Sequence, residues 1–421
     1  MARLTLMTAL LVVLPLLVVS TAPRARGAVE TSASGIPMVR VPGIVSSGGP
    51  GRALAINDAN WVVGMGQLEA PSVTDLPSPT GGVMRPFVWT GVGEAVSALP
   101  NYLQGEPFSG WATDVNTVGE VVGLHYLPTY PPGSQVPFGW TEAAGHREVG
   151  VVGLPGTNGS VGIGDKGTIV GSYQLDASTC DPPSGVGPVT CSFLGDIDAT
   201  DYTIIDGFGG LDVESQFAVG GGSFWTSADG VLPLGGSYDF ANAFGMNGVG
   251  GVAGFVTVGA ATHPAYWSDP AAAPILIAPP GGAFGLARDV NDQGVVVGEW
   301  YTPSGATHGF MWSEADGFLD LDPLQAATSP FSSGPDSAAF SVNSSGVVAG
   351  LSFDETGREV PVLWDPNGAL SVDLPPTIGP IEANGEVGVE LTITPNVADP
   401  EGDPVTVTWT RADVTSEEAG F

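Results

Sequence analysis

The sequence predicts an all-β fold: a β-propeller of about six four-stranded blades, followed by a partial Ig-like β segment. Three features support this prediction: the glycine and proline content, a short hairpin motif that recurs along the chain, and a tryptophan-bearing motif between its copies. The 63 glycines and 37 prolines among 421 residues favour short strands joined by tight turns. After the N-terminal stretch no segment keeps an apolar period near 3.6 residues, so helices are not expected.

The hairpin motif consists of an apolar residue, Asn or Gly, a mostly polar turn, and an apolar run that ends in glycine. This pattern is typical of a strand, a tight turn and a second strand. Its six copies end at Gly64, Gly123, Gly171, Gly254, Gly298 and Gly350. One slot of the turn holds Asn57, Asn116, Asn247, Asn291 and Asn343. Asparagine can bond its own backbone or adopt a left-handed conformation, so we interpret these residues as turn formers.

The second motif lies between these copies and carries an apolar pair, a tryptophan, a polar turn and an apolar strand. The tryptophans of this slot are Trp89, Trp140, Trp225, Trp267, Trp312 and Trp364. The turns at 229–230, 316–317 and 367–368 are Asp-Gly or Asn-Gly pairs, which are strong hairpin signals. Each repeat therefore contains two hairpins, or four strands.

Together the two motifs resemble the extracellular HAF-repeat family, in which an Ile-Asn-x-x-Gly-x-Val-Val-Gly hairpin precedes a His-Ala-Phe-Leu-Trp-like strand. The resemblance covers roughly residues 36 to 374. Segments 262–267 and 307–312, THPAYW and THGFMW, keep the histidine that the other copies lack. The resemblance implies a β-propeller-like fold and no particular chemistry.

Four-stranded units cannot bury both faces alone, and stacking them around an axis leaves only short edges. We therefore assign residues 29–374 to the propeller and interpret 172–222 as one large insertion. Five or seven blades, or an open solenoid, are alternatives to six. Residues 36–43 resemble the strand that closes each repeat, so we expect them to join the first and last blades. Loops of variable length all precede the tryptophan slot, so we expect them to gather on one face and to carry binding.

The N-terminal residues 1–28 are typical of an export signal, with Arg3 before a long apolar run and small residues near the predicted cleavage site. An uncleaved membrane anchor is the alternative. We expect a secreted, extracellular or cell-surface protein that does not insert into a membrane after cleavage. In an oxidising compartment the chain's two cysteines, Cys180 and Cys191, are expected to form a disulfide.

The charge balance is strongly acidic, with 44 acidic against 11 basic residues and a formal net charge of −33. Such a chain repels polyanions, so nucleic acid is not an expected partner. Acidity also favours solubility outside the cell, while divalent cations or basic partners are the alternative reasons for it. We expect a monomer that binds a protein or glycan ligand of unknown identity.

The tail, residues 375–421, resembles the opening half of a bacterial Ig-like or cadherin-like surface module. Asp399, Glu401 and Asp403 alternate along one turn there, and oxygen ligands of this kind suit calcium. A solvated turn is the alternative, and no other cofactor is expected.

Catalytic motifs are absent from the sequence pattern, so we expect a non-catalytic binding or structural repeat protein. His263 and His308 share a repeat slot, which favours a packing role, and His125 and His146 lack the spacing of a zinc motif. The alternative is an extracellular polysaccharide-active propeller enzyme, a hydrolase or lyase, with paired carboxylates. The acids expected to converge on a rim or axis are Asp58, Asp114, Asp165, Asp289 and Asp292.

Overall fold

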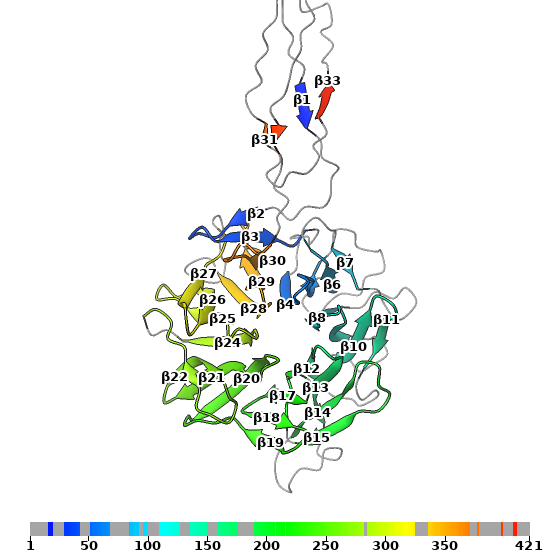
Figure 1. Cartoon of the computed structure of the whole chain (residues 1–421), viewed down its shortest axis with the longest axis vertical. Helices are drawn as coiled ribbons and strands as arrows, with labels where there is room; N and C mark the ends of the chain where they lie inside the picture. The colour runs from blue at the N-terminus through cyan, green and yellow to red at the C-terminus, as the bar shows by residue number, and fades with distance from the viewer. Residues whose placement is uncertain are drawn as a thin grey trace, which may run out of the picture. The chain divides into compact units, whose positions relative to one another are not determined.

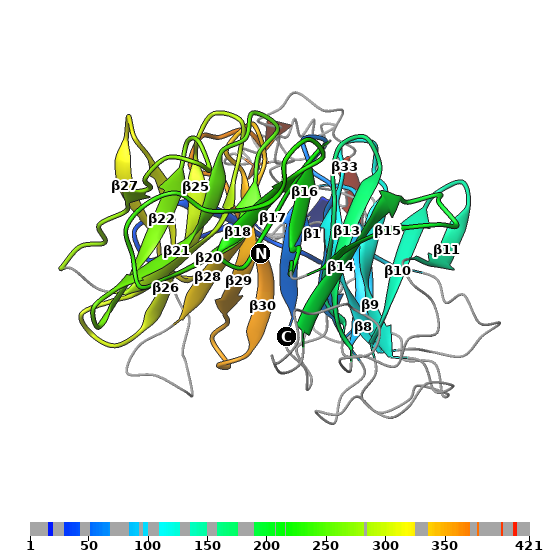
Figure 2. The ribbon, with the colours of Figure 1, turned by 90° about the horizontal axis from the view of Figure 1, so that it is seen from below.

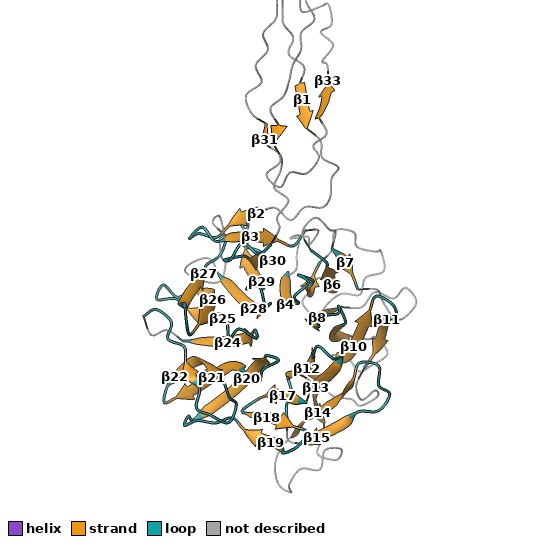
Figure 3. Ribbon diagram, viewed as in Figure 1, coloured by secondary structure: helices purple, strands orange, loops and turns teal. Residues whose placement is uncertain are grey.

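The chain divides into two units, Ala25–Ser371 and the pair of segments Met1–Arg24 and Val372–Phe421. The computed structural model describes residues 16–19, 29–42, 51–67, 84–91, 96–99, 109–126, 135–149, 158–175, 189–206, 208–214, 216–281, 284–324, 336–370, 377–378, 397–398 and 407–410. All regular elements among these residues are strands (Figure 3). None of the described residues forms a helix that could cross a membrane.

The described part of Ala25–Ser371 forms seven antiparallel sheets, which surround a common axis as the blades of a propeller (Figure 1). Blade 1 contains β4 (Arg52–Ile56), β5 (Val62–Gly66), β6 (Arg85–Trp89) and β7 (Ser97–Ala98). Blade 2 contains β8 (Gly110–Val115), β9 (Val121–Tyr126), β10 (Gln135–Thr141) and β11 (Gly145–Glu148). Blade 3 contains β12 (Asn158–Ile163), β13 (Thr168–Leu175), β14 (Val189–Asp196) and β15 (Thr203–Asp206).

The next three blades keep the same strand order, which follows the sequence outward from the axis. Blade 4 contains β16 (Asp212–Glu214), β17 (Phe217–Gly220), β18 (Ser223–Thr226) and β19 (Gly230–Pro233). Blade 5 contains β20 (Phe240–Met246), β21 (Val252–Val258), β22 (Ala261–Trp267) and β23 (Ile275–Leu276). Blade 6 contains β24 (Gly285–Val290), β25 (Val296–Tyr301), β26 (Thr307–Ser313) and β27 (Gly317–Leu321).

Blade 7 joins the two ends of the propeller sequence. It contains β28 (Ser337–Val342), β29 (Val348–Phe353) and β30 (Glu359–Trp364), completed by β3 (Pro37–Arg40) and β2 (Val29–Thr31). β3 pairs with β30 in an antiparallel register that sets Met38 opposite Trp364. The N-terminal strand therefore closes the ring, as the resemblance of residues 36–43 to a blade-closing strand predicts. An ion pair between Arg52 and Glu359, 2.9 Å long, also links blade 1 to blade 7.

The expected number of six blades is wrong, and the structure has the seven that the sequence left as an alternative. The segment 172–222, interpreted as one insertion, contains β14 to β17 and so supplies the outer half of blade 3 and the inner half of blade 4. The fourth hairpin is difficult to see because Glu214 pairs directly with Phe217, which leaves a turn of two residues and no asparagine. Blade 3 also lacks a tryptophan, because Gly195 stands at that slot.

The two ends of the propeller carry different connections, and Figure 2 shows the strands running between them. Turns between the first and second strands, such as 57–61, lie at one end, which we call the turn face. Loops between the second and third strands leave from the opposite end, the loop face, because the strands are antiparallel. The long variable loops, 68–83, 127–134 and 176–188, lie outside the described residues, so a binding role for them stays a prediction.

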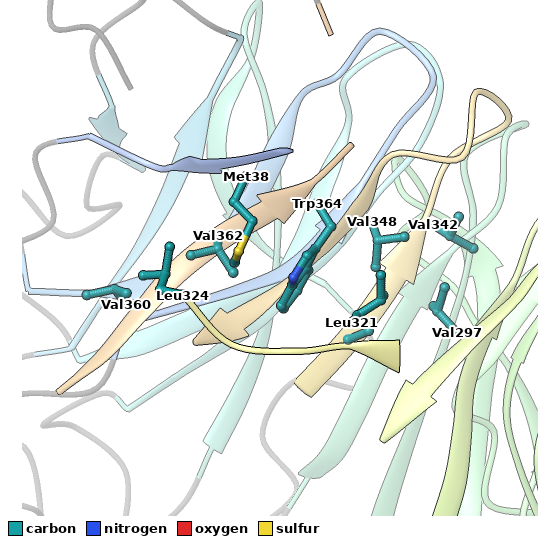
Figure 4. Close-up of a cluster of buried hydrophobic side chains, with 10 residues drawn as sticks. Met38, Val297, Leu321, Leu324, Val342, Val348, Val360, Val362 and Trp364 are labelled. Atoms are coloured by element: carbon teal, nitrogen blue, oxygen red, sulfur yellow. The ribbon is translucent and has the colours of Figure 1, made fainter. Parts of the chain in front are cut away.

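The apolar core lies between neighbouring blades. Between blades 6 and 7, for example, Leu321 and Val297 pack with Val348, Trp364 and Met38 (Figure 4). Each repeat tryptophan occupies the same position in the third strand, opposite the residue two before the motif's final glycine; the pairs are Trp89–Val62, Trp140–Val121, Trp225–Ala218, Trp267–Val252, Trp312–Val296 and Trp364–Val348. Burying a large aromatic at each blade interface contributes about 1.5–3 kcal/mol or more per side chain.

The described residues of the second unit form only short strands. β1 (Leu16–Val19) pairs with β33 (Val407–Thr410), and β31 (Thr377–Ile378) pairs with β32 (Val397–Ala398). The expected calcium ligands Asp399, Glu401 and Asp403 lie outside the described residues. The signal peptide at 1–28 and the Ig-like segment at 375–421 therefore stay predictions.

Candidate functional site

A cavity of about 380 Å³, which we call the channel, lies on the propeller axis and is lined by the inner strands and first turns of the blades. In six blades the inner strand carries a β-bulge or irregularity, and in five of them it lies at the same position, as at Ala112/Asp114 in β8 and Ala287/Asp289 in β24. A bulge inserts an extra residue and turns neighbouring side chains toward the same side. Thr113 and Asp114 therefore both line the cavity, although they are consecutive residues.

A tier of three aspartates surrounds the cavity, one from every second blade: Asp114, Asp212 and Asp289. Their slot in the other blades holds only small residues: Ala55, Gly162, Gly245 and Ser341. The two glycines leave room for the next blade: a Cβ on Gly245 would lie 2.7 Å from the carbonyl oxygen of Arg288 and 3.0 Å from Oδ1 of Asp289. A Cβ on Gly162 would likewise lie 3.3 Å from Oδ1 of Asp212.

Each of these carboxylates joins two blades. Oδ1 of Asp114 accepts the N–H of Val115 at 2.8 Å, and Oδ2 accepts the N–H of Ile163 in blade 3 at 2.8 Å. Asp212 binds Val213 and Met246 of blade 5 in the same way, each at 2.8 Å. For Asp289 the two donors are Val290, at 2.7 Å, and Val342 of blade 7, at 2.9 Å. The aspartate tier is thus part of the propeller's scaffold as well as of its channel wall.

Burial raises the pKa of all three aspartates. The pKa of Asp114 rises to about 7, mainly through loss of hydration and further through the negative charges of Asp289 and Asp165. Burial also holds the pKa of Asp212 well above its usual range, and the charges of Asp114 and Asp289 add to the effect. For Asp289 burial again raises the pKa, against the opposing backbone hydrogen bonds from Val342 and Val290.

The asparagines of the hairpin motif form a second ring next to the aspartates. The Oδ1 atom of Asn291 accepts the N–H groups of Gln293 and Val295 in its own turn. Its Nδ2 donates to the carbonyl of Asn343 in the next blade at 2.8 Å. The same link between blades runs from Asn57 to Asn116, from Asn116 to Gly164, from Asn247 to Asn291 and from Asn343 to Asn57. These buried side chains therefore connect blades in addition to shaping turns.

Four further carboxylates line the mouth of the cavity on the turn face: Asp58, Asp165, Glu214 and Asp292. Each accepts a backbone N–H from the turn of the preceding blade; the pairs are Ser344–Asp58 at 2.8 Å, Thr117–Asp165 at 3.1 Å, Asp165–Glu214 at 3.0 Å and Gly248–Asp292 at 2.8 Å. Asp58, Asp165 and Asp292 are exposed to solvent. They leave carboxylate surface available to a ligand at the mouth.

Among the described residues that line the cavity, seven are carboxylates and one, Arg288, is a cation. Arg288 is itself engaged, because its guanidinium pairs with Glu299 and lies 4.6 Å from the ring centre of Phe244. The exposed Lys166 follows Asp165 in its turn but does not line the cavity. The carboxylates therefore make the cavity negatively charged, most strongly at its mouth, because burial raises the pKa values of the three inner aspartates.

The structure brings all five acids expected to converge, Asp58, Asp114, Asp165, Asp289 and Asp292, to this one cavity. Sequence reasoning missed Asp212 and Glu214 because the hairpin of blade 4 was not recognised. A signal for it exists: the pair Asp-Val precedes the turn at 114–115, 212–213 and 289–290 alike, and the run after it again ends in glycine, at Gly220.

The histidines fall into two groups. His125 on β9 and His146 on β11 are buried, and their rings lie 5.0 Å apart beside Phe138. Burial lowers the pKa of His125 to about 3, with a further contribution from His146, and burial lowers the pKa of His146 to about 4. His308 instead contacts Asp320, with Nδ1 3.0 Å from Oδ1.

Two further predicted residues, Cys191 and His263, are described and do not line the channel. Cys191 is buried in β14, while Cys180 lies outside the described residues, so the disulfide between them stays a prediction. His263 is partly exposed on β22. Across the described ranges, no group of three or more His, Cys, Asp or Glu side chains is placed to hold a metal ion.

Comparisons with known proteins identify the fold. No family model matches the chain, and no curated protein sequence matches it. Among solved structures, the β-propeller domain of the Trilobed protease from Pyrococcus furiosus is similar, with a TM-score of 0.50 at 9% identity over 75% of this chain and 94% of that one. The acylaminoacyl peptidase of Pyrococcus horikoshii matches with a TM-score of 0.49 at 8% identity, over 86% of this chain and 57% of that one. At such identities the likeness concerns architecture alone, and the chain is a β-propeller.

Proposed function

We propose that this chain is an exported, non-catalytic binding protein whose propeller channel takes a ligand with several positive charges. The observation that carries this proposal is the ring of seven carboxylates around one cavity of about 380 Å³, opposed by a single arginine that is already paired. Export rests on the N-terminal segment 1–28, and the bound partner would be a basic segment of a protein or a polyamine-like molecule.

The arrangement of the carboxylates supports a ligand with separated charges. They form two tiers, and successive members belong to different blades, so that an elongated cation can meet several of them in turn. The exposed acids at the mouth, Asp58, Asp165 and Asp292, would meet the ligand first. A cleft of one sign of charge raises the local concentration of opposite charges and speeds their association.

A carbohydrate-active enzyme is the second candidate, and one observation favours it. A carboxyl group with a pKa near 7, as in Asp114, is suited to general acid catalysis near neutral pH. Against it, both oxygens of Asp114 already accept backbone N–H groups of two blades. The same holds for Asp212 and Asp289, so the three inner carboxylates act in holding blades together, and binding remains the better-supported function.

Calorimetric titration of the full chain with spermidine tests the proposal. We expect saturable binding at roughly 0.15 M salt, where unspecific attraction to surface charge is largely screened. The triple variant Asp58→Asn, Asp165→Asn, Asp292→Asn should weaken binding by about tenfold or more, since each lost contact with a charged group costs about 1 kcal/mol.

A matched triple variant controls for net charge. Glu142→Gln, Asp201→Asn and Glu314→Gln remove the same number of charges from exposed sites that do not line the cavity. This variant should bind spermidine as the wild type does. Equal weakening by both triple variants, or no saturable binding to the wild type, would contradict the proposal. Turnover of a polysaccharide that Asp114→Asn abolishes would favour the enzyme instead.

A further inference from the structure

A second cavity, of about 440 Å³, opens between blades 4 and 5 and is distinct from the axial channel in its chemistry. Its walls are largely apolar and include Val219, Phe224, Leu232 and Val252. Apolar cavities of a few hundred Å³ with a few polar groups at the edge are the usual form of a ligand site. We call this cavity the blade 4–5 cleft.

The cleft borders blade 4, whose first turn is shorter than that of blade 1. In blade 1 the five-residue turn 57–61 carries Trp61, which packs against the next blade: a Cβ on Gly119 of blade 2 would lie 2.5 Å from Cζ3 of Trp61. In blade 4, by contrast, Glu214 pairs directly with Phe217, and the turn between them has only two residues. The adjacent turn of blade 5 carries an apolar side chain, Val249, that is 71% exposed and borders the cleft.

The edge of the cleft combines exposed apolar and acidic side chains. Phe217 is 46% exposed on the blade 4 side, facing a cleft that Val249 borders from blade 5. Asp229 and Asp269, both exposed, lie in the turns that border the same cleft. No lysine, arginine or histidine is among the described residues that line it. An apolar floor with an acidic edge is complementary to an apolar group that carries positive charges beside it.

We propose that the blade 4–5 cleft binds an extended peptide segment of a partner protein in which an apolar side chain is flanked by basic residues. The apolar side chain enters between Phe217 and Val249, and the basic residues lie beside Asp229 and Asp269. The chain's negative charge excludes the other large apolar partner, a bilayer with anionic headgroups, because like charges repel. The two cavities share one lining residue, Met246, and the cleft proposal does not depend on binding in the channel.

The experiment uses three short peptides and the full chain, with binding measured by calorimetry at roughly 0.15 M salt. The probe is acetyl-Lys-Phe-Lys-amide, and we expect saturable binding. Acetyl-Lys-Ala-Lys-amide should bind about tenfold more weakly, because it has the same charge and lacks the apolar group. Acetyl-Glu-Phe-Glu-amide should show no binding, because its charges face the acidic edge.

Two matched variants locate the site. Val249 and Val118 occupy the same turn position in blades 5 and 2, each is 71% exposed, and only Val249 lines the cleft. Val249→Arg places a cation at the edge of the cleft and should weaken the Phe peptide about tenfold, while Val118→Arg should leave its affinity unchanged. Both substitutions lie at exposed turn positions, and thermal melting verifies that each variant is folded.

Three outcomes would overturn the proposal: no saturable binding of the Phe peptide, equal affinity for the Phe and Ala peptides, or equal weakening by the two arginine variants. Failure of the channel proposal is distinguishable from these outcomes. Spermidine has no apolar side chain, and the channel triple variant changes no residue of the cleft. If the wild type did not bind spermidine but bound the Phe peptide more tightly than the Val249→Arg variant did, the cleft proposal would stand and the channel proposal would be wrong.

Discussion

The Nδ2 atom of Asn343, in the last blade, donates a hydrogen bond to the carbonyl oxygen of Asn57, in the first blade, at 3.2 Å. The same nitrogen donates to Oδ1 of Asn60 at 2.8 Å. On its other side, Oδ1 of Asn343 accepts the N–H of Val347 at 3.0 Å. One buried amide therefore shapes its own turn and closes the ring across the seam where sequence-distant blades meet.

Replacing this amide should cost more than replacing an exposed one. Asn343→Ala removes bonds on both sides of the seam and leaves buried backbone groups without partners, so the free energy of unfolding should fall by about 2–3 kcal/mol. Urea denaturation of the full chain measures it. Asn367→Ala is the control, because Asn367 is exposed and bonds only to the carbonyl of Ser345 among the bonds described; it should change the free energy by about 0.5 kcal/mol or less. If the two variants lost equal free energies of unfolding, the hydrogen bonds of Asn343 across the seam would have no special role in stability.

The two recurring sequence motifs predicted the fold class and the closing strand, because both depend on residues that recur in the blades. The turn asparagines recur in five blades and the strand tryptophans in six, because most blades use the same hydrogen bonds and the same aromatic packing. The number of blades was predicted wrongly because blades 3 and 4 have other residues at some of these positions. In blade 3 the ring of Tyr202 fills the space beside Gly195: a Cβ on Gly195 would lie 2.5 Å from Cδ1 of Tyr202. Because Tyr202 lies outside the tryptophan-bearing strand, comparing the repeats position by position does not reveal this replacement.

The candidate channel was predicted in part for the same reason. Asp114 and Asp289 belong to recognised copies of the motif, and their convergence follows from equivalent positions in equivalent blades. Asp212 occupies the same slot in a blade whose turn is shortened, and it was missed together with that blade. The blade 4–5 cleft was missed as well, because it borders the blade whose first hairpin was not recognised.

The replacement of tryptophan by the Gly195–Tyr202 pair makes a coupled prediction. Gly195→Ala should destabilise the wild-type chain, since its Cβ would collide with the Tyr202 ring, and should be nearly neutral in a Tyr202→Ala background. Tyr202→Ala alone should cost about 2–4 kcal/mol, because the ring also packs 5.5 Å from Phe193. A double-mutant cycle from urea denaturation measures the coupling. Additive effects would show that the ring does not occupy the tryptophan slot.

The aspartate tier should make the propeller less stable as pH rises. Burial raises the pKa of Asp114 from 3.8 to about 7, so between these values the native state binds more protons than the unfolded state. Its contribution is complete below about pH 4 and is lost as pH rises through about 7, with a slope of at most about 1.4 kcal/mol per pH unit per proton. Asp114→Asn removes this titration, so its free energy of unfolding should fall less steeply across this range.

The control for this measurement is Thr113→Val, a neighbour on the same bulge that does not titrate. Thr113 donates from Oγ1 to the carbonyl of Val161, so its loss should destabilise the chain by a constant amount at every pH. Urea denaturation between about pH 4 and pH 8 measures both variants. A constant offset between Asp114→Asn and the wild type would contradict the assignment of a raised pKa to Asp114.

The histidine pair in blade 2 should act in the opposite direction. Burial lowers the pKa of His125 from 6.5 to about 3, and that of His146 from 6.5 to about 4. Below pH 6.5 the unfolded state therefore binds more protons than the native state, and stability is lost as pH falls. Over the same range the aspartates gain stability as pH falls, so the two effects oppose each other in the wild type.

Removing the histidines should reveal the contribution of the aspartates. In a His125→Leu, His146→Leu variant the loss of stability toward acid disappears, and the free energy of unfolding should rise steadily as pH falls from about 7 to 4. Phe138→Leu is the matched control, because it perturbs the same cluster without removing a titrating group, and its offset from the wild type should not change with pH. If the double histidine variant kept the same dependence on pH as the wild type, the buried pair would not be neutral in the native state.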